Sequence, residues 1–144
     1  MRVLFELLHN KVLLPALCAQ LSSQLFKIIR TWIKAKEIRL DHIAQYGDFP
    51  SAHTAFIVSG TLMAGLVEGW QSAVFALGVI FSSIVISDAL VQRKALEKTQ
   101  EAVESLAGKK IFNPPFRGHT GKEILAGAVI GIIWVVFFSI IWQV

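Results

Sequence analysis

The stretch ILAGAVIGIIWVVFFSIIW, residues 124–142, carries no charged side chain and is long enough to cross the hydrocarbon core of a bilayer, which takes about 20 apolar residues. Residues 71–90 form a second such stretch, apolar except at the ends and at a few serines. Residues 52–67 are a little shorter and equally uncharged. Residues 12–29 have the length of a span but carry polar side chains, so we expect them to pack against the other helices rather than face lipid.

The composition agrees with a membrane location. Of 144 residues, 54% are hydrophobic and the mean hydropathy is +0.59, which leaves too few polar side chains to coat a soluble globule. We therefore expect one domain over residues 1–144, an all-α integral membrane helical bundle of about four transmembrane helices. The charged segment at residues 93–107 is expected to add a solvated, amphipathic cytoplasmic helix that rests on the lipid headgroups. Glu6 and His9 interrupt the apolar amino terminus, so we expect no cleaved signal peptide.

Basic residues lie beside two of the predicted connections. Five of the 14 lysines and arginines fall between residues 27 and 50, and seven between residues 90 and 123, whereas residues 68–71 have none. Cytoplasmic loops carry an excess of Lys and Arg, so we expect a multi-pass protein of the cell membrane with both long connections in the cytoplasm. Attraction to anionic headgroups explains the net charge of +4, and we expect membrane lipids, not nucleic acid, as partners.

Residues 47–55, GDFPSAHTA, place polar side chains at the start of the second predicted span. Asp48 is suited to cap this helix, with Pro50 in the first turn. Backbone N–H groups are then left free around three residues, Ser51, Ala52 and His53. A helix start of this kind attracts phosphate, and the Ser51 hydroxyl can add a donor. The simpler alternative is that these are polar residues at the membrane interface.

A second motif, GHTGKE at residues 118–123, starts the last predicted span. His119 and Glu123 are four residues apart and are expected to share a helical face. A carboxylate in that position holds one imidazole N–H and raises the basicity of the other ring nitrogen. Gly118 permits close approach of a ligand, and three nearby cations are suited to neutralise a phosphate, namely Arg93, Arg117 and Lys122. Without such a ligand the His–Glu pair would be a surface pair worth about 0.2–0.5 kcal/mol.

Together these motifs resemble the ordered motif series of the divergent branch of the type 2 phosphatidic acid phosphatase superfamily, which also includes bacterial acid phosphatases and vanadium haloperoxidases. The resemblance runs from about Asn10 to Gly131. It rests on PSAHTA at residues 50–55, on Asp88 followed by Arg93 and Lys94, and on Gly118-His119-Thr120 with Glu123 and Gly127.

The resemblance implies an all-helical membrane phosphatase that acts on a phosphorylated lipid and needs no metal or other cofactor. By resemblance, His119 attacks phosphorus to form a phosphohistidine, Glu123 takes the place of the usual Asp, and His53 protonates the leaving oxygen. The implied phosphate-binding residues are Ser51, Ala52, Arg93, Lys27 and Gly118. Supporting roles fall to Asp88, Arg117 and Lys122.

Three features separate the chain from the family pattern. No Lys-x6-Arg-Pro element is present, Arg93 lies 26 residues before His119 in place of the Ser-Arg-x5-His spacing, and Asp48 puts a negative charge beside the expected phosphate site. Two other classes therefore stay open: a non-catalytic lipid-headgroup-binding or scaffolding membrane protein of the same fold, and a metal site or small transporter that uses His53, His119, Asp88 and Glu123.

Small residues predict where helices approach closely. Gly127-x-x-x-Gly131 and Gly60-x-x-x-Ala64 have the spacing of helix-packing surfaces. Because three or four short spans build only a thin core, we also expect a homo-oligomer, most simply a two-fold dimer. The single cysteine, Cys18, excludes an intramolecular disulfide and lies in an apolar run, where it is expected to act as a small hydrophobe.

Overall fold

The computed structural model describes residues 5–6, 9–35, 49–112 and 118–144. Within them the regular structure is entirely helical, which confirms the predicted all-α class. The helices in chain order are α2 (Leu13–Ala35), α3 (Ala52–Glu68), α4 (Ala73–Ser87), the π-helical segment η2 (Asp88–Gln92), α5 (Arg93–Ala107) and α6 (Gly121–Trp142).

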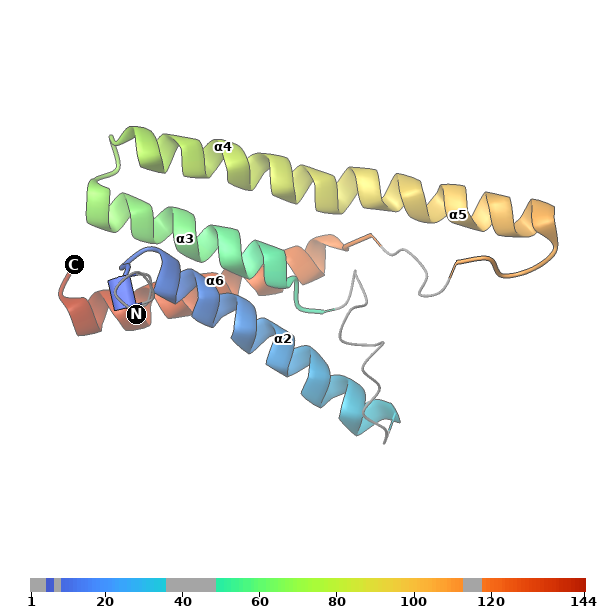
Figure 1. Cartoon of the computed structure of the whole chain (residues 1–144), viewed down its shortest axis with the longest axis horizontal. Coiled ribbons are helices and arrows are strands. Elements are labelled where there is room, and N and C mark those ends of the chain that lie inside the picture. The colour runs from blue at the N-terminus through green and yellow to red at the C-terminus, as the bar shows by residue number, and fades with distance from the viewer. Residues whose placement is uncertain (1–4, 7–8, 36–48, 113–117) are drawn as a thin grey trace.

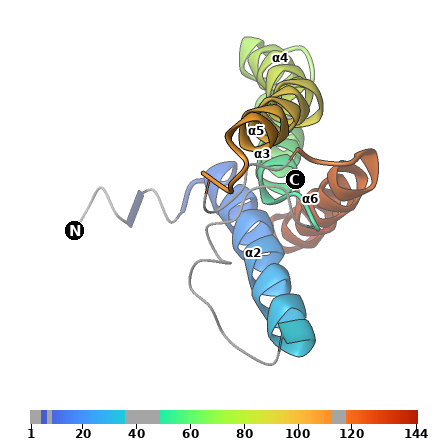
Figure 2. The ribbon, with the colours of Figure 1, turned by 90° about the vertical axis from the view of Figure 1, so that its right-hand side faces the viewer.

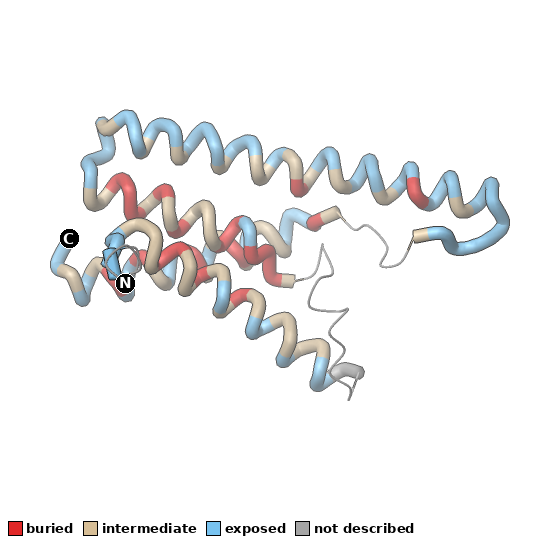
Figure 3. Tube along the Cα trace, in the orientation of Figure 1, coloured by how far each residue is buried: buried red, intermediate tan, exposed pale blue. Residues whose placement is uncertain are grey.

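Helix α3 lies at the centre of the molecule and packs against α2, α4 and α6 (Figure 2). Most buried positions of the chain are on α3 and on the sides of α2 and α6 that face it (Figure 3). Most of the buried residues are small or polar, with Met63 and His119 the largest side chains that are fully buried. Close helix approach, rather than bulky side chains, therefore builds this core.

The contact between α3 and α6 depends on two glycines. A Cβ on Gly127 would collide with the backbone oxygen of Ser51, and one on Gly131 would lie 2.7 Å from the oxygen of Ala55. The predicted packing surface is thus confirmed, but its partner is α3 of the same chain. This glycine pair therefore offers no free face for a dimer, and the expected homo-oligomer stays a prediction without that support.

Polar side chains link the outer helices to the bundle. The indole Nε1 of Trp134 in α6 donates to Ser22 Oγ of α2 at 2.9 Å. The hydroxyls of Thr61 in α3 and Ser82 in α4 are 2.9 Å apart. Gly78 lets α4 approach Thr61, because a Cβ there would be 3.0 Å from the Thr61 hydroxyl. Such bonds between helices are favourable where no water competes for the polar groups.

Two helical stretches in the described part of the chain are long and apolar enough to cross a membrane, Ala73–Ala107 and Gly121–Trp142. Helix α4 has no buried residue, so its apolar side chains are exposed as those of a lipid-facing helix are. Helix α3 is apolar but shorter, and α2 carries Lys27 and Arg30. The protein is a membrane protein with at least these two candidate spans, and the four-span arrangement stays a prediction.

Helices α4 and α5 form one continuous rod, which the sequence did not predict. The π-helical segment η2 joins them, and Figure 1 shows α5 continuing in the direction of α4. The 35 residues extend about 50 Å, against a hydrocarbon thickness of about 30 Å. If α4 crosses the bilayer, the straight continuation carries α5 away from it, and the expected resting place of α5 on the headgroups stays a prediction.

Candidate functional site

Ser51 caps the start of α3. Its Oγ accepts the backbone N–H of Thr54 at 3.4 Å and the Thr54 hydroxyl at 2.9 Å. The predicted cap, Asp48, lies outside the described residues, and the N-cap position belongs to Ser51. Because Ser51 Oγ accepts both bonds, neither uses its own hydroxyl hydrogen, although the residue is fully buried.

Some backbone N–H groups at the start of α3 already donate a hydrogen bond, and others have no acceptor within the helix. Ser51 N donates to the backbone oxygen of Glu123 at 3.0 Å. The prediction that this amide is free to bind an anion is therefore wrong. The N–H groups of Ala52 and His53 lie in the first turn, where an α-helix provides no backbone acceptor. Ala52 is buried, whereas the His53 side chain is exposed.

His119 and Glu123 meet, although not on a helical face as predicted. Helix α6 begins at Gly121 with Thr120 as its N-cap, so His119 precedes the helix. Glu123 completes a capping box, in which its Oε2 accepts the Thr120 N–H at 3.0 Å. The same oxygen lies 3.0 Å from His119 Nδ1.

This contact assigns the tautomer of His119. An ionised carboxylate only accepts hydrogen bonds, so Nδ1 carries the proton and Nε2 keeps its lone pair. The His119 side chain is only 2% exposed. Burial lowers the pKa of His119, the bond and charge of Glu123 partly oppose this, and the charges of Lys27 and Arg93 lower the pKa further. The imidazole is therefore neutral at pH 7, as a nucleophile must be.

The His119 segment also returns to the α4–α5 rod. His119 N donates to the carbonyl oxygen of Ala89, in η2, at 3.1 Å, and Gly118 N donates to Glu97 Oε2 at 3.2 Å. A Cβ on Gly118 would lie 2.9 Å from the backbone nitrogen of Lys94. The chain thus runs out along α5 and back again to the start of that helix (Figure 1).

This return accounts for the unusual spacing of Arg93 and His119. Helix α5 lies between them in the sequence, and the bond from His119 N to Ala89 in η2 places His119 near the start of α5, where Arg93 is. The Nε of Arg93, the first residue of α5, donates to Oδ2 of Asp88 in η2 at 3.2 Å. This bond fixes the orientation of the guanidinium. A π-helical segment is often found at functional sites.

The cluster draws residues from three helices and the α6 cap. The charges of Arg93 and Lys27 interact electrostatically with the imidazoles of both His53 and His119. His53 also interacts electrostatically with Asp88 and His119. Lys122 is exposed on the first turn of α6, and Arg117 lies outside the described residues. The structure therefore brings both histidines within electrostatic range of Arg93 and Lys27, with Asp88 also in range of His53 and Glu123 bonded to His119. Ser51 and Gly118 lie beside them through Ser51 N–Glu123 O and the Gly118–His119 peptide.

Sequence reasoning missed two groups of this cluster. The Ala89 carbonyl is a backbone group, which every residue has, so the sequence cannot indicate its role. Glu97 was read as one of several charges on a solvated helix, and only the return of the chain shows that it binds Gly118.

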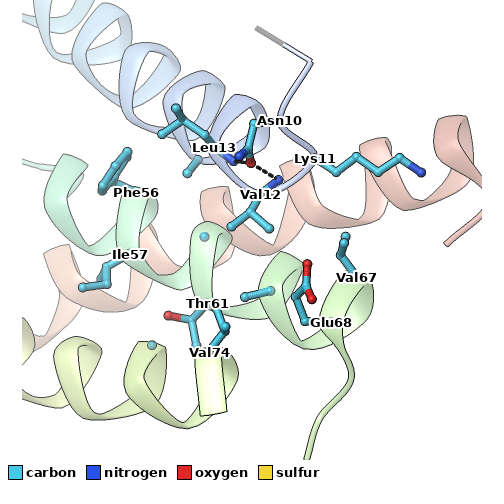
Figure 4. A pocket seen from close by; sticks show the side chains of 14 residues that line it. Asn10, Lys11, Val12, Leu13, Phe56, Ile57, Thr61, Val67, Glu68 and Val74 are labelled. Carbon is cyan, nitrogen blue, oxygen red and sulfur yellow. Dashed lines mark hydrogen bonds between the residues drawn. The ribbon is translucent and has the colours of Figure 1, made fainter. Parts of the chain in front are cut away.

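Two cavities lie along the bundle. One, of about 420 Å³, lies beside the first turns of α6; its lining is apolar except for Lys122 and comprises Phe26, Phe49, Pro50, Lys122, Leu125, Ala126, Val129 and Ile130. The other, of about 830 Å³, lies at the opposite end of α3, between the starts of α2 and α4 (Figure 4). Neither cavity is lined by a histidine, so we place the candidate site at the histidines on the contacts of His119 described above.

The described part of the chain contains no set of side chains suited to bind a metal ion. No group of three or more His, Cys, Asp or Glu side chains there is arranged to hold an ion. The His119 nitrogen nearest to a carboxylate bonds to it directly, at a hydrogen-bond distance.

Comparison with known proteins identifies relatives of this chain. Residues 8–134 match the family described as the divergent PAP2 family. Over 94 residues the chain is 32% identical to the uncharacterized membrane protein YuiD of Bacillus subtilis (strain 168), an alignment that covers 65% of the chain and 60% of YuiD. The aligned region thus spans less than two thirds of that relative's length. No solved structure matches the chain.

Proposed function

Because the chain belongs to the divergent PAP2 family, we propose that it is a membrane phosphatase that hydrolyses a lipid phosphate or diphosphate at the cytoplasmic face. The observation that carries this proposal is the His119 imidazole, which is buried and held by Glu123 through Nδ1 at 3.0 Å. Its neutral state and the two cations within range suit attack on a phosphate.

In the first proposed step, Nε2 of His119 attacks phosphorus and the bond from phosphorus to the lipid oxygen breaks. His53 donates a proton to that leaving oxygen, and the phosphoryl group stays on His119. Glu123 stabilises the positive charge that develops on the imidazole, as the third member of a catalytic triad does. In the second step, water attacks phosphorus, His53 accepts its proton, and free phosphate and neutral His119 result.

The phosphate is held by groups that converge from separate elements. Arg93, oriented by Asp88, supplies charge and directed N–H groups. Lys27 adds a second charge from α2, and the Ser51 hydroxyl and the Ala52 amide donate from the start of α3. Gly118, next to His119, has no side chain that would obstruct the approach of the phosphate. Lys122, the one charged residue in the lining of the cavity of about 420 Å³, is a supporting cation.

A lipid substrate is favoured by the apolar cavity beside the site. This cavity of about 420 Å³ starts at Lys122 on the first turn of α6 and extends along that helix to Val129 and Ile130. A hydrocarbon chain lying there would have Lys122, three residues after His119 in the sequence, at one end of its path. A small water-soluble phosphate would leave this apolar surface unused.

One observation favours a second candidate, a protein of the same fold that binds lipid headgroups without turnover. The carboxylate of Asp88 neutralises part of the Arg93 charge through a 3.2 Å contact. A cation whose charge is partly neutralised gives less electrostatic stabilisation to the charge that develops in a transition state.

The two candidates are separated by an assay of phosphate release. Purified protein would be mixed with vesicles that contain phosphatidate, phosphatidylglycerophosphate or a polyprenyl phosphate, in the presence of EDTA. We expect release from at least one lipid by the wild type and none by His119→Ala. Binding of these vesicles without release would support the headgroup-binding protein. Activity that EDTA removes and a divalent cation restores would instead require a metal mechanism.

A further inference from the structure

We propose that Glu97 of α5 is a positioning residue, which holds the backbone of Gly118 and thereby fixes the His119 imidazole in the site. For its effect on turnover this inference rests on the proposed phosphatase function. For its effect on His119 itself it rests on the structure alone.

Helix α5 uses its carboxylates to bind the chain that returns beside it. Glu97 Oε2 accepts the N–H of Gly118 at 3.2 Å. Two helical turns further on, Glu104 Oε1 accepts the N–H groups of Ile111 and Phe112, each at 3.0 Å. These two backbone bonds lower the pKa of Glu104. The polar side of α5 is therefore a row of acceptors that faces the returning backbone, and not only a solvated surface.

The Glu97 bond acts directly next to the reactive imidazole. Gly118 and His119 are adjacent, and their amides are held by Glu97 and by the Ala89 carbonyl, respectively. On the other side, Glu123 holds Nδ1. A bond from an amide to a carboxylate is about twice as strong as one between neutral groups, so Glu97 contributes more to this backbone anchor than the Ala89 carbonyl does.

Loss of this anchor should move His119 without removing any group that touches the substrate. Displacement of a reacting group by about 1 Å can lower the rate about 10²-fold. The neighbouring position is also tight, because Gly118 lies against the backbone of Lys94. When Glu97 is removed, we expect the Gly118–His119 backbone to move away from α5 and the imidazole to become more exposed.

The first arm of the test measures His119 directly, by nitrogen-15 NMR titration of the histidines in detergent. The chain has 4 histidines, and the signal missing from His119→Ala identifies the one in the site. In Glu97→Ala we expect the pKa of His119 to rise toward the ordinary value of about 6.5, because exposure removes the burial that lowers it. Glu97→Gln keeps an acceptor for the Gly118 N–H and should titrate like the wild type.

The second arm measures the rate of phosphate release. In Glu97→Ala we expect kcat to fall about 10- to 100-fold with a smaller change in KM, and Glu97→Gln to restore most of it. The matched control is Glu101→Ala, an exposed carboxylate of the same helix, which should leave both the titration and the rate unchanged. Glu97→Asp withdraws the carboxylate by one CH2 group while keeping its charge, and it tests the same contact if the alanine variant does not fold.

The two arms fail in different ways. A wild type that hydrolyses no lipid phosphate contradicts the proposed function, and the titration still decides the role of Glu97. A wild-type titration of His119 in both Glu97→Ala and Glu97→Asp overturns the positioning role, whatever the rates. An effect of Glu101→Ala equal to that of Glu97→Ala would also overturn it, because the Gly118 bond would then explain nothing.

Discussion

Burial and a carboxylate act on His119 in opposite directions. Burial disfavours the imidazolium, whereas Glu123 favours it, and burial is the larger effect. The imidazole therefore stays neutral in the resting protein and gains a partner for the charge that it acquires when it attacks phosphorus. A resting imidazolium could not attack, and without Glu123 the charged intermediate would be isolated in a buried place.

The resting state of His119 can be tested by titration. We expect His119 to titrate below the ordinary value of about 6.5, because its pKa is lowered in the folded protein. The Glu123→Gln variant removes the charge that raises this pKa and should titrate lower still. Histidine nitrogen-15 shifts measured across pH would show both effects. A wild-type His119 that is half protonated at or above pH 6.5 contradicts this account of the site.

The two histidines should differ in their dependence on the leaving group. A nucleophile is needed for every substrate, whereas general acid catalysis contributes about 10²- to 10⁴-fold and matters most for a poor leaving group. His119→Ala should therefore abolish hydrolysis of both an alkyl phosphate and an activated aryl phosphate. His53→Ala should lose the alkyl substrate and largely keep the aryl one. Equal losses on the two substrates in His53→Ala would argue against its role as the acid.

At the scale of helices, the glycines of α6 hold the two motifs together. Gly127 lies against the backbone of Ser51, and the Ser51 N–H donates to the backbone of Glu123. The start of α3 and the first turn of α6 are thus joined by main-chain contacts, which explains how motifs far apart in the sequence form one site.

The Gly127 contact predicts a difference between two glycine variants of one helix. A Cβ at Gly127 would collide with Ser51, so Gly127→Ala should lower the unfolding free energy by about 1–3 kcal/mol and reduce turnover. At Gly121 no atom lies within 4 Å of a new Cβ, so Gly121→Ala should be neutral or stabilise α6 by up to about 1 kcal/mol. Thermal unfolding in detergent would compare them, and equal stabilities would contradict the packing described here.

At the scale of the whole molecule, charge predicts orientation. Basic residues crowd the connections on either side of α3 and α4 at the end that holds the site, and the short turn between these two helices has none. In a background without Cys18, single cysteines at Lys98 and at Gln71 should therefore react with a membrane-impermeant reagent from opposite sides. Lys98 should be labelled only from the cytoplasmic side. Labelling of both positions from one side would contradict the four-span arrangement.

The helices and the positions of both motifs could be predicted because their signals are local. Long uncharged runs mark α4 and α6. The helix starts were predicted a few residues too early, because Asp48 and Gly118 precede Ser51 and Thr120, which are the actual N-caps. The continuity of α4 with α5 and the return of His119 to Ala89 could not be predicted. They depend on a π-helical segment and on a bond between backbone groups, which any residues can form.

The proposed function depends most directly on a covalent bond between phosphorus and His119. A lipid phosphate labelled with phosphorus-32 would be mixed with the protein and quenched in alkali, where a phosphohistidine survives, during the first turnover. We predict that label stays on the wild-type chain at His119, that it disappears as phosphate is released, and that His119→Ala acquires none. Phosphate release by the wild type without any labelled chain, or an equally labelled His119→Ala, would contradict the account.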